Sequence, residues 1–418
     1  NQPTVNRTVQ TYHRFPSKQI TGPSADSGDD SWHSLSTDYC LVLWGLLAVC
    51  SCSNLSHVLV DGGAWFSRAA YPYLSTVTCV GHATVSTGAF PRTHGIVGNS
   101  WFDRDLGRSI GCSADDAATT ISYAAPASGG HGPSRLASAT LADELRSQLP
   151  VPARVVTMSI KERTAITLAG RRADAVTWFN RSAGGFVTSS AYAPTPVPFV
   201  EAFTKANPVT ADLGKVWTRS LPVERYLFAD AGRGEKPAAF WSAEFPHAVK
   251  GKGDAPDDQF FEAWEGSPYS DDYLGRLAIA SVDALKLGQG GGTDFLGVSF
   301  SALDLVGHDF GPTSHEVQDT LARLDRTIGA LLDHLDRTVG AGNFVVALTG
   351  DHGAAPIPEQ AAALGIDAGR LDVALLRQAA QGALEAALGP GTHPVRVQGS
   401  DLILEPQTVD RLRSDPRA

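Results

Sequence analysis

Positive charge is scarce in this sequence. Its 34 lysine and arginine residues stand against 44 aspartate and glutamate residues, which gives a formal net charge of −10. A nucleic-acid-binding groove needs a basic stripe, so we expect no such groove. The negative total does not exclude a phosphate-bearing substrate, because a few cations gathered in one cleft can reverse the local field.

Cysteine is also rare. The five cysteines are Cys40, Cys50, Cys52, Cys79 and Cys112, an odd number without a C-x-x-C pair. This pattern argues against a structural zinc knuckle or a thioredoxin-like site. A chain of this size is also not expected to depend on a disulfide framework.

Long hydrophobic runs are missing too. No stretch reaches the roughly 18 apolar residues needed to cross a bilayer, so no transmembrane span is expected. The longest run, residues 40–50, has the length of a signal-peptide core, but 39 residues precede it, among them Asp26, Asp29 and Asp30. A signal-peptide core and a buried strand or helix are therefore equally good interpretations of this run.

The remaining composition is that of an ordinary globular enzyme, with 43% hydrophobic and 19% charged residues. A length of 418 residues allows one elaborated α/β domain or two domains. Residues 1–39 are polar and lack periodicity, which is typical of a tail or of disorder. Residues 71–104 are rich in turn signals, and loops of this kind commonly carry catalytic groups.

The middle of the chain contains three predicted elements. Leucines from Leu136 to Leu149 share one helical face, and Pro150 ends that helix. Residues 154–160 are predicted as a strand and residues 273–287 as a helix. The glycine-rich residues 288–292 are interpreted as a flexible joint.

The last third of the chain has the clearest pattern. Residues 295–300 and 344–348 are predicted as short buried strands. Between them, Thr313 and Glu316 form a capping-box start for an amphipathic helix over residues 317–335. Strand, helix and strand in this order predict a right-handed parallel crossover, and ligands bind beyond the carboxyl ends of such strands.

An Asp/His pair follows each of these two predicted strands. Asp304 and His308 come after the first strand, and Asp351 and His352 come after the second. Carboxylate and imidazole groups are good zinc ligands, and two adjacent metals can clamp both oxygens of a phosphoryl transfer. One pair alone would be better explained as ordinary loop residues, but two pairs at equivalent strand ends favour a metal centre.

Several separated segments carry a family resemblance. Residues 76–104 read TVTCVGHATVSTGAFPRTHGIVGNSWFDR and resemble the nucleophile region of the alkaline phosphatase superfamily, in particular its bacterial periplasmic phosphomonoesterase branch. The nucleotide pyrophosphatase/phosphodiesterases are relatives. Residues 299–312 (SFSALDLVGHDFGP) and 348–359 (LTGDHGAAPIPE) resemble the two metal motifs of the same family. The resemblance covers about residues 58–360.

The resemblance implies roles for four residues. Thr78 would be the nucleophile, and coordination to zinc would favour its alkoxide. Asn99 would donate to a phosphate oxygen. Lys161 and Arg163 resemble the cation pair of the monoesterase branch, and alternate residues of an extended segment would point both at one oxyanion. Read alone, these residues would be a buried strand-end threonine, a turn residue and a solvated cation pair.

Three neighbouring residues receive structural interpretations. We expect His82 and His94 to be scaffold residues that hydrogen-bond the loop rather than metal ligands. Cys79 lacks the C-x-P-x-R context of a sulfatase and is interpreted as a packing thiol.

Two ligands that the family implies are not found. Asp61 lies only 17 residues before Thr78, and Asp38, 40 residues upstream, precedes the apolar run instead of following it. His393 is a weak substitute for the last histidine ligand of the family. These gaps leave open a catalytically impaired phosphate-binding remnant.

We therefore predict an α/β fold with a mostly parallel central sheet flanked by helices. Residues 57–150 and 294–418 would form the core, which is expected to be incomplete at the C-terminus. Residues 151–293 would form an inserted cap that carries the cation pair, and residues 1–56 an atypical N-terminal segment.

The expected activity is hydrolysis of small phosphate monoesters through a phosphothreonine intermediate, with a phosphodiesterase or nucleotide pyrophosphatase as the alternative. Two zinc ions per chain are expected, one held by Thr78, Asp351 and His352 and one by Asp304 and His308. The resemblance also implies a periplasmic or secreted protein, and we expect a monomer.

Overall fold

The computed structural model describes residues 62–64, 66, 69–391, 393–398 and 401–414. It contains two compact units: the first comprises the described parts of Asn1–Asn99 and Cys112–Ile357, and the second those of Ser100–Gly111 and Pro358–Ala418. The predicted N-terminal segment, residues 1–56, lies outside the described residues, as do the apolar run and the ligand candidates Asp38 and Asp61.

A five-stranded sheet forms the centre of the first unit, in the order β3-β6-β5-β4-β9. Strand β4 lies parallel to β5 and to β9, whereas β6 is antiparallel to β5 and to β3. The α/β prediction is confirmed, and the sheet is mixed. The strands are β3 (Thr120–Ser122), β4 (Val155–Ser159), β5 (Ala175–Asn180), β6 (Gly185–Ser189) and β9 (Phe295–Ser299).

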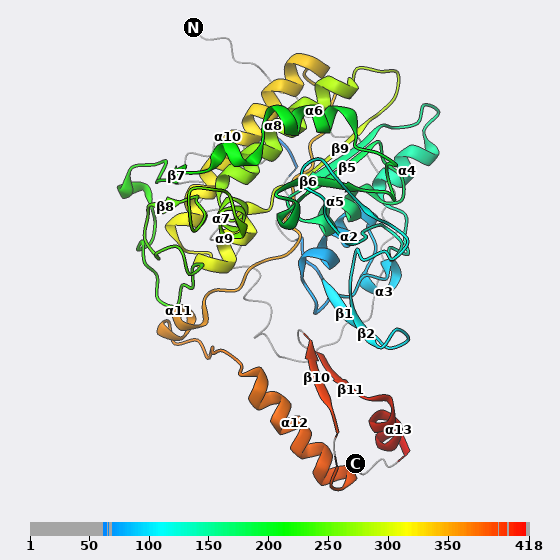
Figure 1. Cartoon of the computed structure of the whole chain (residues 1–418), viewed down its shortest axis with the longest axis vertical. Helices are drawn as coiled ribbons and strands as arrows, with labels where there is room; N and C mark the ends of the chain where they lie inside the picture. Colours follow the sequence, from blue (N-terminus) through cyan, green and yellow to red (C-terminus); the bar gives the residue numbers. More distant parts are fainter. Residues whose placement is uncertain (1–61, 65, 67–68, 392, 399–400, 415–418) are drawn as a thin grey trace. The chain divides into compact units, whose positions relative to one another are not determined.

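Helices cover both faces of this sheet (Figure 1). The helices of the first unit are α2 (Thr78–Thr87), α3 (Pro91–His94), α4 (Leu141–Gln148), α5 (Glu162–Ala169), α6 (Pro198–Ala206), α7 (Asp258–Glu265), α8 (Pro268–Leu285), α9 (Ala302–Phe310) and α10 (His315–Leu335), the last continued by a π-helical turn at Asp336–Gly340. A short ladder joins β7 (Val216–Trp217) to β8 (His247–Ala248).

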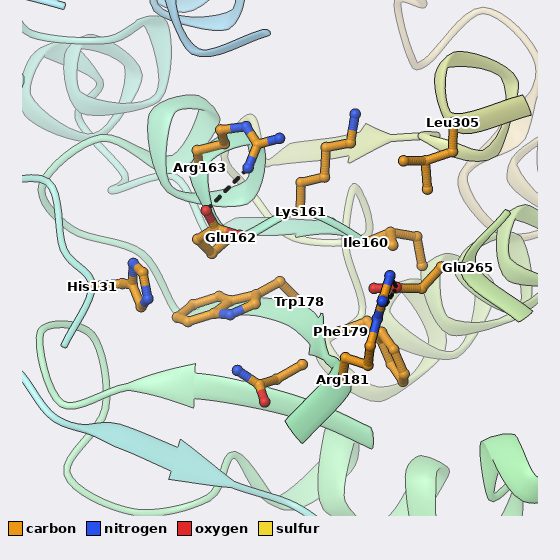
Figure 2. Close-up of a pocket in the computed structure, with 11 residues that line it drawn as sticks. His131, Ile160, Lys161, Glu162, Arg163, Trp178, Phe179, Arg181, Glu265 and Leu305 are labelled. Carbon is orange, nitrogen blue, oxygen red and sulfur yellow. Dashed lines mark hydrogen bonds and ion pairs between the residues drawn. The ribbon is translucent and has the colours of Figure 1, made fainter. Parts of the chain in front are cut away.

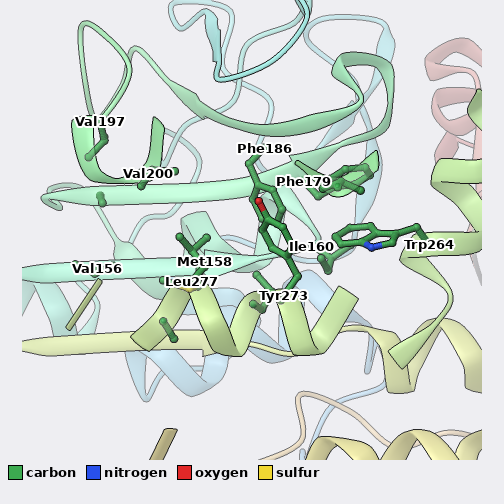
Figure 3. Packing of buried hydrophobic residues seen from close by; sticks show 14 of the residues in the cluster. Val156, Met158, Ile160, Phe179, Phe186, Val197, Val200, Trp264, Tyr273 and Leu277 are labelled. Carbon is green, nitrogen blue, oxygen red and sulfur yellow. The ribbon is translucent and has the colours of Figure 1, made fainter. Parts of the chain in front are cut away.

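Strand β4 shows how the sequence produces this layering. All five of its residues are buried, as expected for a strand covered on both faces. Val156 and Met158 pack in the cluster that includes Tyr273 and Leu277 of α8 (Figure 3). The intervening Thr157 donates its hydroxyl to the Ala165 carbonyl of α5 at 2.8 Å. The alternation of side chains along one strand therefore binds a helix to each face.

Several predicted elements are confirmed with small shifts. Strand β4 corresponds to predicted residues 154–160 and β9 to residues 295–300. Helix α4 starts at Leu141 instead of Leu136, because Thr140 and Asp143 form a capping box there. Helix α8 starts earlier than predicted, at Pro268.

The predicted capping box of α10 is wrong by one residue. Ser314, not Thr313, is the N-cap, and its hydroxyl accepts from the backbone N–H of Val317 at 3.1 Å. The predicted apolar face is confirmed, since Val317, Leu321 and Ile328 along it are buried.

The strand predicted at residues 344–348 is wrong, and with it the predicted parallel crossover. These residues form no helix or strand, and the side chains of Val345 and Leu348 are 81% and 58% exposed. Within the part of the chain that the structure describes, β9 is the edge strand of its sheet. A β-forming composition makes a strand only where a partner supplies ladder hydrogen bonds and cover, and the described residues supply neither here.

The division into core and inserted cap remains a prediction. Strands β4, β5 and β6 lie within residues 151–293, and they share one sheet with β9. This sheet therefore takes strands from both sides of the predicted boundary at residue 294.

The second unit combines a hairpin with the C-terminal segment. The hairpin consists of β1 (Ser100–Asp103) and β2 (Arg108–Gly111). Gln398 hydrogen-bonds with Ser100 and Ser109, and the Arg396 guanidinium lies 4.8 Å from the ring centre of Phe102. The other elements are α11 (Pro358–Ala363), α12 (Val373–Leu388), β10 (Val395–Gln398), β11 (Asp401–Leu404) and α13 (Pro406–Ser414). Across the described residues, no helix has the length and apolar character that a bilayer span requires.

Candidate active site

Thr78 lies at the start of α2 rather than at the end of a strand. Val77 precedes it with an extended backbone and is the N-cap of the helix. Thr78 is 5% exposed, and its Oγ1 lies 3.3 Å from Nε2 of His352, a residue 274 positions later. The first turn of a helix favours anions through its free N–H groups and its dipole, so this position suits a phosphoryl group.

Three of the four residues of the predicted Asp/His pairs gather beside this threonine, whereas His308 is largely exposed next to Asp304. Asp304 and His308 lie one turn apart on α9, with Asp304 Oδ1 3.6 Å from His308 Nε2. Nε2 of His352 lies 3.7 Å from Asp304 Oδ1 and 3.5 Å from Asp351 Oδ2. The side chain of His308 is 72% exposed, whereas that of His352 is 14% exposed. Thr78, Asp304, Asp351 and His352 thus form one cluster.

His82 ties this cluster together. Its Nδ1 lies 2.9 Å from the Thr78 carbonyl and 3.1 Å from Asp351 Oδ2, and its Nε2 lies 3.0 Å from Ser299 Oγ at the end of β9. Burial raises the pKa of Asp351, but the hydrogen bond and charge of His82 and the charge of His352 outweigh it. The pKa of Asp351 is therefore below its usual value, which keeps the carboxylate ionised and able to bind a cation.

The two predicted cations are not on an extended segment. Lys161 is the N-cap residue of α5 and Arg163 lies in its first turn, so the alternation expected for a strand does not apply. Lys161 Nζ forms an ion pair with Asp304 Oδ2, and Arg163 pairs with Glu162 at 3.2 Å. The structure thus brings Lys161 into the cluster around Thr78 through Asp304.

A pocket of about 270 Å³ lies beside these cations. In Figure 2, Lys161 and Arg163 lie on one side of the pocket, and Trp178, Phe179 and Arg181 lie on the other. The lining residues are His131, Ile160, Lys161, Glu162, Arg163, Trp178, Phe179, Asn180, Arg181, Glu265 and Leu305. The pocket was not predicted, because its lining comes from several separate segments that no single motif marks.

Asn99 is held against the start of α2. Its Oδ1 accepts from the backbone N–H of Cys79 at 2.8 Å. Cys79 forms a disulfide with Cys112, with the Cα atoms 6.6 Å apart. The interpretation of Cys79 as a packing thiol is therefore wrong. Five cysteines without a spacing motif do not reveal a pairing over 33 residues, because only the fold brings the two sulfur atoms together.

His94 behaves as the predicted scaffold residue. Its Nε2 lies 3.2 Å from Thr84 Oγ1, and its Nδ1 accepts from the backbone N–H of Ile96 at 3.1 Å. Burial lowers the pKa of His94, which favours the neutral ring that accepts this hydrogen bond.

A zinc ion needs several carboxylate, imidazole or thiolate donors directed at one point. Among the described residues, no group of three or more His, Cys, Asp or Glu side chains is placed so that it could hold a metal ion. The pairs on α9 and at residues 351–352 nevertheless supply carboxylate and imidazole atoms 3.5–3.7 Å apart, and this combination of donors suits zinc. The weak substitute His393 lies in the second unit, with Nε2 3.1 Å from the Gly389 carbonyl.

Comparison with known proteins identifies the family. The family model described as type I phosphodiesterase / nucleotide pyrophosphatase matches residues 44–385. The chain belongs to this family. The predicted resemblance to the alkaline phosphatase superfamily is also confirmed, because similar proteins are named alkaline phosphatases.

Two of these proteins are alkaline phosphatases by name. PhoV of Synechococcus elongatus is 34% identical over 303 residues, which cover 72% of this chain and 54% of PhoV. PafA of Elizabethkingia meningoseptica is 34% identical over 304 residues, which cover 71% of this chain and 54% of PafA. The chain thus spans about half the length of the curated relatives it matches.

The fold matches the crystal structure of PafA. The TM-score is 0.72 at 29% identity, and the match covers 82% of this chain and 65% of that chain. A PafA variant with a threonine, an asparagine, a lysine and an arginine replaced gives the same TM-score at 27% identity. The α/β architecture of the first unit is therefore shared with PafA.

Proposed function

We propose that this protein hydrolyses phosphate monoesters and that Thr78 is the nucleophile. The observation that carries the proposal is the position of Thr78 Oγ1 at the N-terminus of α2, 3.3 Å from His352 Nε2 and in one cluster with Asp304 and Asp351. The PafA variant supports it. The same four residue types stand here in the same order and with the same spacing, as Thr78, Asn99, Lys161 and Arg163.

The proposed reaction has two displacements. Thr78 Oγ1 forms a bond to phosphorus, the ester P–O bond breaks, and the alcohol leaves with a proton. Water then attacks phosphorus, the bond to Thr78 breaks, and inorganic phosphate is released. Asn99, Lys161 and Arg163 bind the nonbridging oxygens. A monoester carries more negative charge than a diester, so two cations favour monoesters.

The proposed cofactor is zinc, two ions per chain. Thr78, Asp351 and His352 would hold one ion, and Asp304 and His308 the other. Bound zinc would lower the pKa of the Thr78 hydroxyl and neutralise charge on the leaving oxygen. In this arrangement His82 positions Asp351 by hydrogen bonding, and Lys161 lies beside Asp304 so that its charge faces the phosphoryl group.

The proposed location is the periplasm or outside the cell. The proposed ligands are small phosphate esters, and the protein is proposed to be a monomer. The names of PhoV and PafA support phosphate ester substrates. The Cys79–Cys112 disulfide supports an oxidising compartment.

Thr78→Ala tests the nucleophile. We expect turnover of p-nitrophenyl phosphate to fall more than about 1,000-fold, because the substitution removes the proposed attacking oxygen. Thr87→Ala, at the other end of the same helix, is the matched control and should retain activity. A Thr78→Ala protein that keeps near-normal turnover would refute the proposal.

Lys161→Ala tests the substrate class against the second candidate, a phosphodiesterase, which the family description favours. We expect a loss of about 100-fold on p-nitrophenyl phosphate and a smaller loss on its bis-ester. Lys205→Ala, on the exposed side of α6, is the control. Faster hydrolysis of the bis-ester by the unmodified protein would support the phosphodiesterase. Zinc below one ion per chain without turnover would support the phosphate-binding remnant.

A further inference from the structure

Asn99 is held from two directions by the two residues of one disulfide. Its side-chain Oδ1 accepts from the N–H of Cys79 at 2.8 Å, and its backbone carbonyl accepts from the N–H of Cys112 at 3.0 Å. The disulfide joins Cys79 to Cys112, and both are buried, at 0% and 4% exposure. Cys79 directly follows Thr78. Two hydrogen bonds and one disulfide therefore connect Cys79, Asn99 and Cys112 in a ring next to the proposed nucleophile.

This ring of contacts sets the orientation of the Asn99 amide. An asparagine side chain has one acceptor side and one donor side. Because Cys79 N–H occupies the acceptor Oδ1, the amide is turned so that its Nδ2 group remains as the donor. A phosphate oxygen needs a donor, and so the hydrogen bond from Cys79 selects the useful face of Asn99.

The hydrogen bonds alone are a weak restraint. Asn99 is exposed, so water competes for its amide. The segment before it contains Gly95 and Gly98, and the hairpin β1–β2 follows it and returns at Cys112. The covalent link between Cys79 and Cys112 ties the segment at Cys112, and with it the backbone hydrogen bond to Asn99, to α2 independently of the exposed side-chain hydrogen bond.

We propose that Cys79 and Cys112 are positioning residues and that their disulfide holds Asn99 in the orientation that binds the phosphoryl group. This inference rests on the proposed function, since it assigns a device to the same site. It predicts that phosphate binding depends on the oxidation state of the pair. Reduction by a dithiol transfers two electrons and two protons to the disulfide, yields two thiols and leaves the dithiol as a cyclic disulfide.

The first test is a double-mutant cycle with p-nitrophenyl phosphate as substrate and inorganic phosphate as inhibitor. We expect Cys112→Ser to raise KM and the phosphate inhibition constant about tenfold, as a lost hydrogen bond to a charged group would. In an Asn99→Ala background the same substitution should add less than about twofold, because the residue it positions is absent. If the effects of Cys112→Ser and Asn99→Ala multiplied in the double variant, the proposal would be overturned.

The matched control is Val80→Ala. Val80 is fully buried on the same helix and adjacent to Cys79, so this variant loosens the packing of α2 but keeps the disulfide. We expect it to unfold at a lower temperature with an unchanged KM. An equal rise of KM in Val80→Ala would show that general destabilisation explains the effect, and would overturn the proposal.

A second measurement does not require turnover. Hydrogen exchange of the peptides that contain Cys79 and Asn99 should be faster in Cys112→Ser than in Val80→Ala. If Cys112→Ser does not fold, wild-type protein treated with dithiothreitol provides the reduced state. Unchanged exchange, or free thiols at both cysteines in the untreated protein by peptide mapping, would overturn the inference. An absence of phosphatase activity would refute the proposed function separately.

Discussion

Gly81 is placed where the backbone of Asp351 touches α2. A Cβ atom at this position would lie 1.9 Å from the Asp351 carbonyl oxygen, far inside a van der Waals contact. The neighbouring His82 binds the side chain of the same aspartate. The position of Asp351 beside Thr78 therefore depends on a residue without a side chain one turn along the helix.

Gly81→Ala should displace the Asp351 segment, because the added methyl group would overlap the Asp351 carbonyl oxygen. We expect kcat/KM for p-nitrophenyl phosphate to fall about 100-fold, since a shift of about 1 Å in a reacting group has that effect. Gly382→Ala in α12 meets no atom within 4 Å and should leave activity unchanged, with a gain of about 0.5–1 kcal/mol in stability. Equal activity of both variants would contradict this account.

Asp271 is a second residue whose surroundings lead to a measurable effect. It is buried on α8, and its Oδ1 accepts from the backbone N–H groups of Ser301 and Ala302 at 3.0 and 3.2 Å. Burial raises its pKa to about 7, although these hydrogen bonds and the charge of Lys161 act in the opposite direction. Since the folded-state pKa lies above the unfolded value, its protonation stabilises the fold below about pH 4, and this contribution is lost as pH rises through 7.

Asp271→Asn should remove this pH dependence while keeping the acceptor. We expect the variant to gain stability relative to wild type between pH 4 and pH 8, by about 4 kcal/mol at most. Urea unfolding at several pH values, followed by circular dichroism, measures the difference. Parallel stability curves for the two proteins would show that Asp271 titrates normally.

At the scale of elements, helix α10 illustrates what local pattern predicts. Its apolar face could be predicted because a period of 3.6 residues is a property of the chain alone. Its start was misplaced by one residue because serine and threonine are both good N-caps, and only the backbone course selects Ser314. The segment at residues 344–348 shows the opposite limit, since a strand depends on a partner elsewhere in the sequence.

Ser314→Ala tests the position of the cap. We expect it to lower the free energy of unfolding by about 1 kcal/mol, because the N–H of Val317 loses its acceptor in a buried site. Thr313→Ala, at the position indicated by the sequence pattern, should have the smaller effect. A larger loss for Thr313→Ala in chemical denaturation would reverse this assignment.

At the scale of the whole molecule, the site joins segments that are far apart in the chain. Thr78, Lys161, Asp304 and His352 come from α2, the β4–α5 junction, α9 and an irregular segment. If two zinc ions bind among them as proposed, the ions cross-link four parts of the first unit. A ligand that binds only the folded state stabilises it by about 4 kcal/mol at 1,000 times its Kd.

Removal of metal should therefore affect activity and stability together. We expect dialysis against a chelator to abolish p-nitrophenyl phosphate turnover and to lower the melting temperature, and zinc to restore both. Elemental analysis should give about two zinc ions per chain before dialysis. A chelated protein with unchanged melting temperature and turnover would rule out the proposed metal site.

The sequence by itself was sufficient to predict features that depend only on residues close together in the chain. The motifs around Thr78, Asp304 and Asp351 and the helical periodicity of α10 are local patterns, so they identified the family, the α/β class and the candidate site. The pairing of Cys79 with Cys112, the contact of His82 with Asp351 and the ion pair of Lys161 with Asp304 could not be predicted in this way. Each joins segments whose distance in space depends on how helices pack on the sheet, and the free energy of that packing belongs to the folded chain rather than to any one segment.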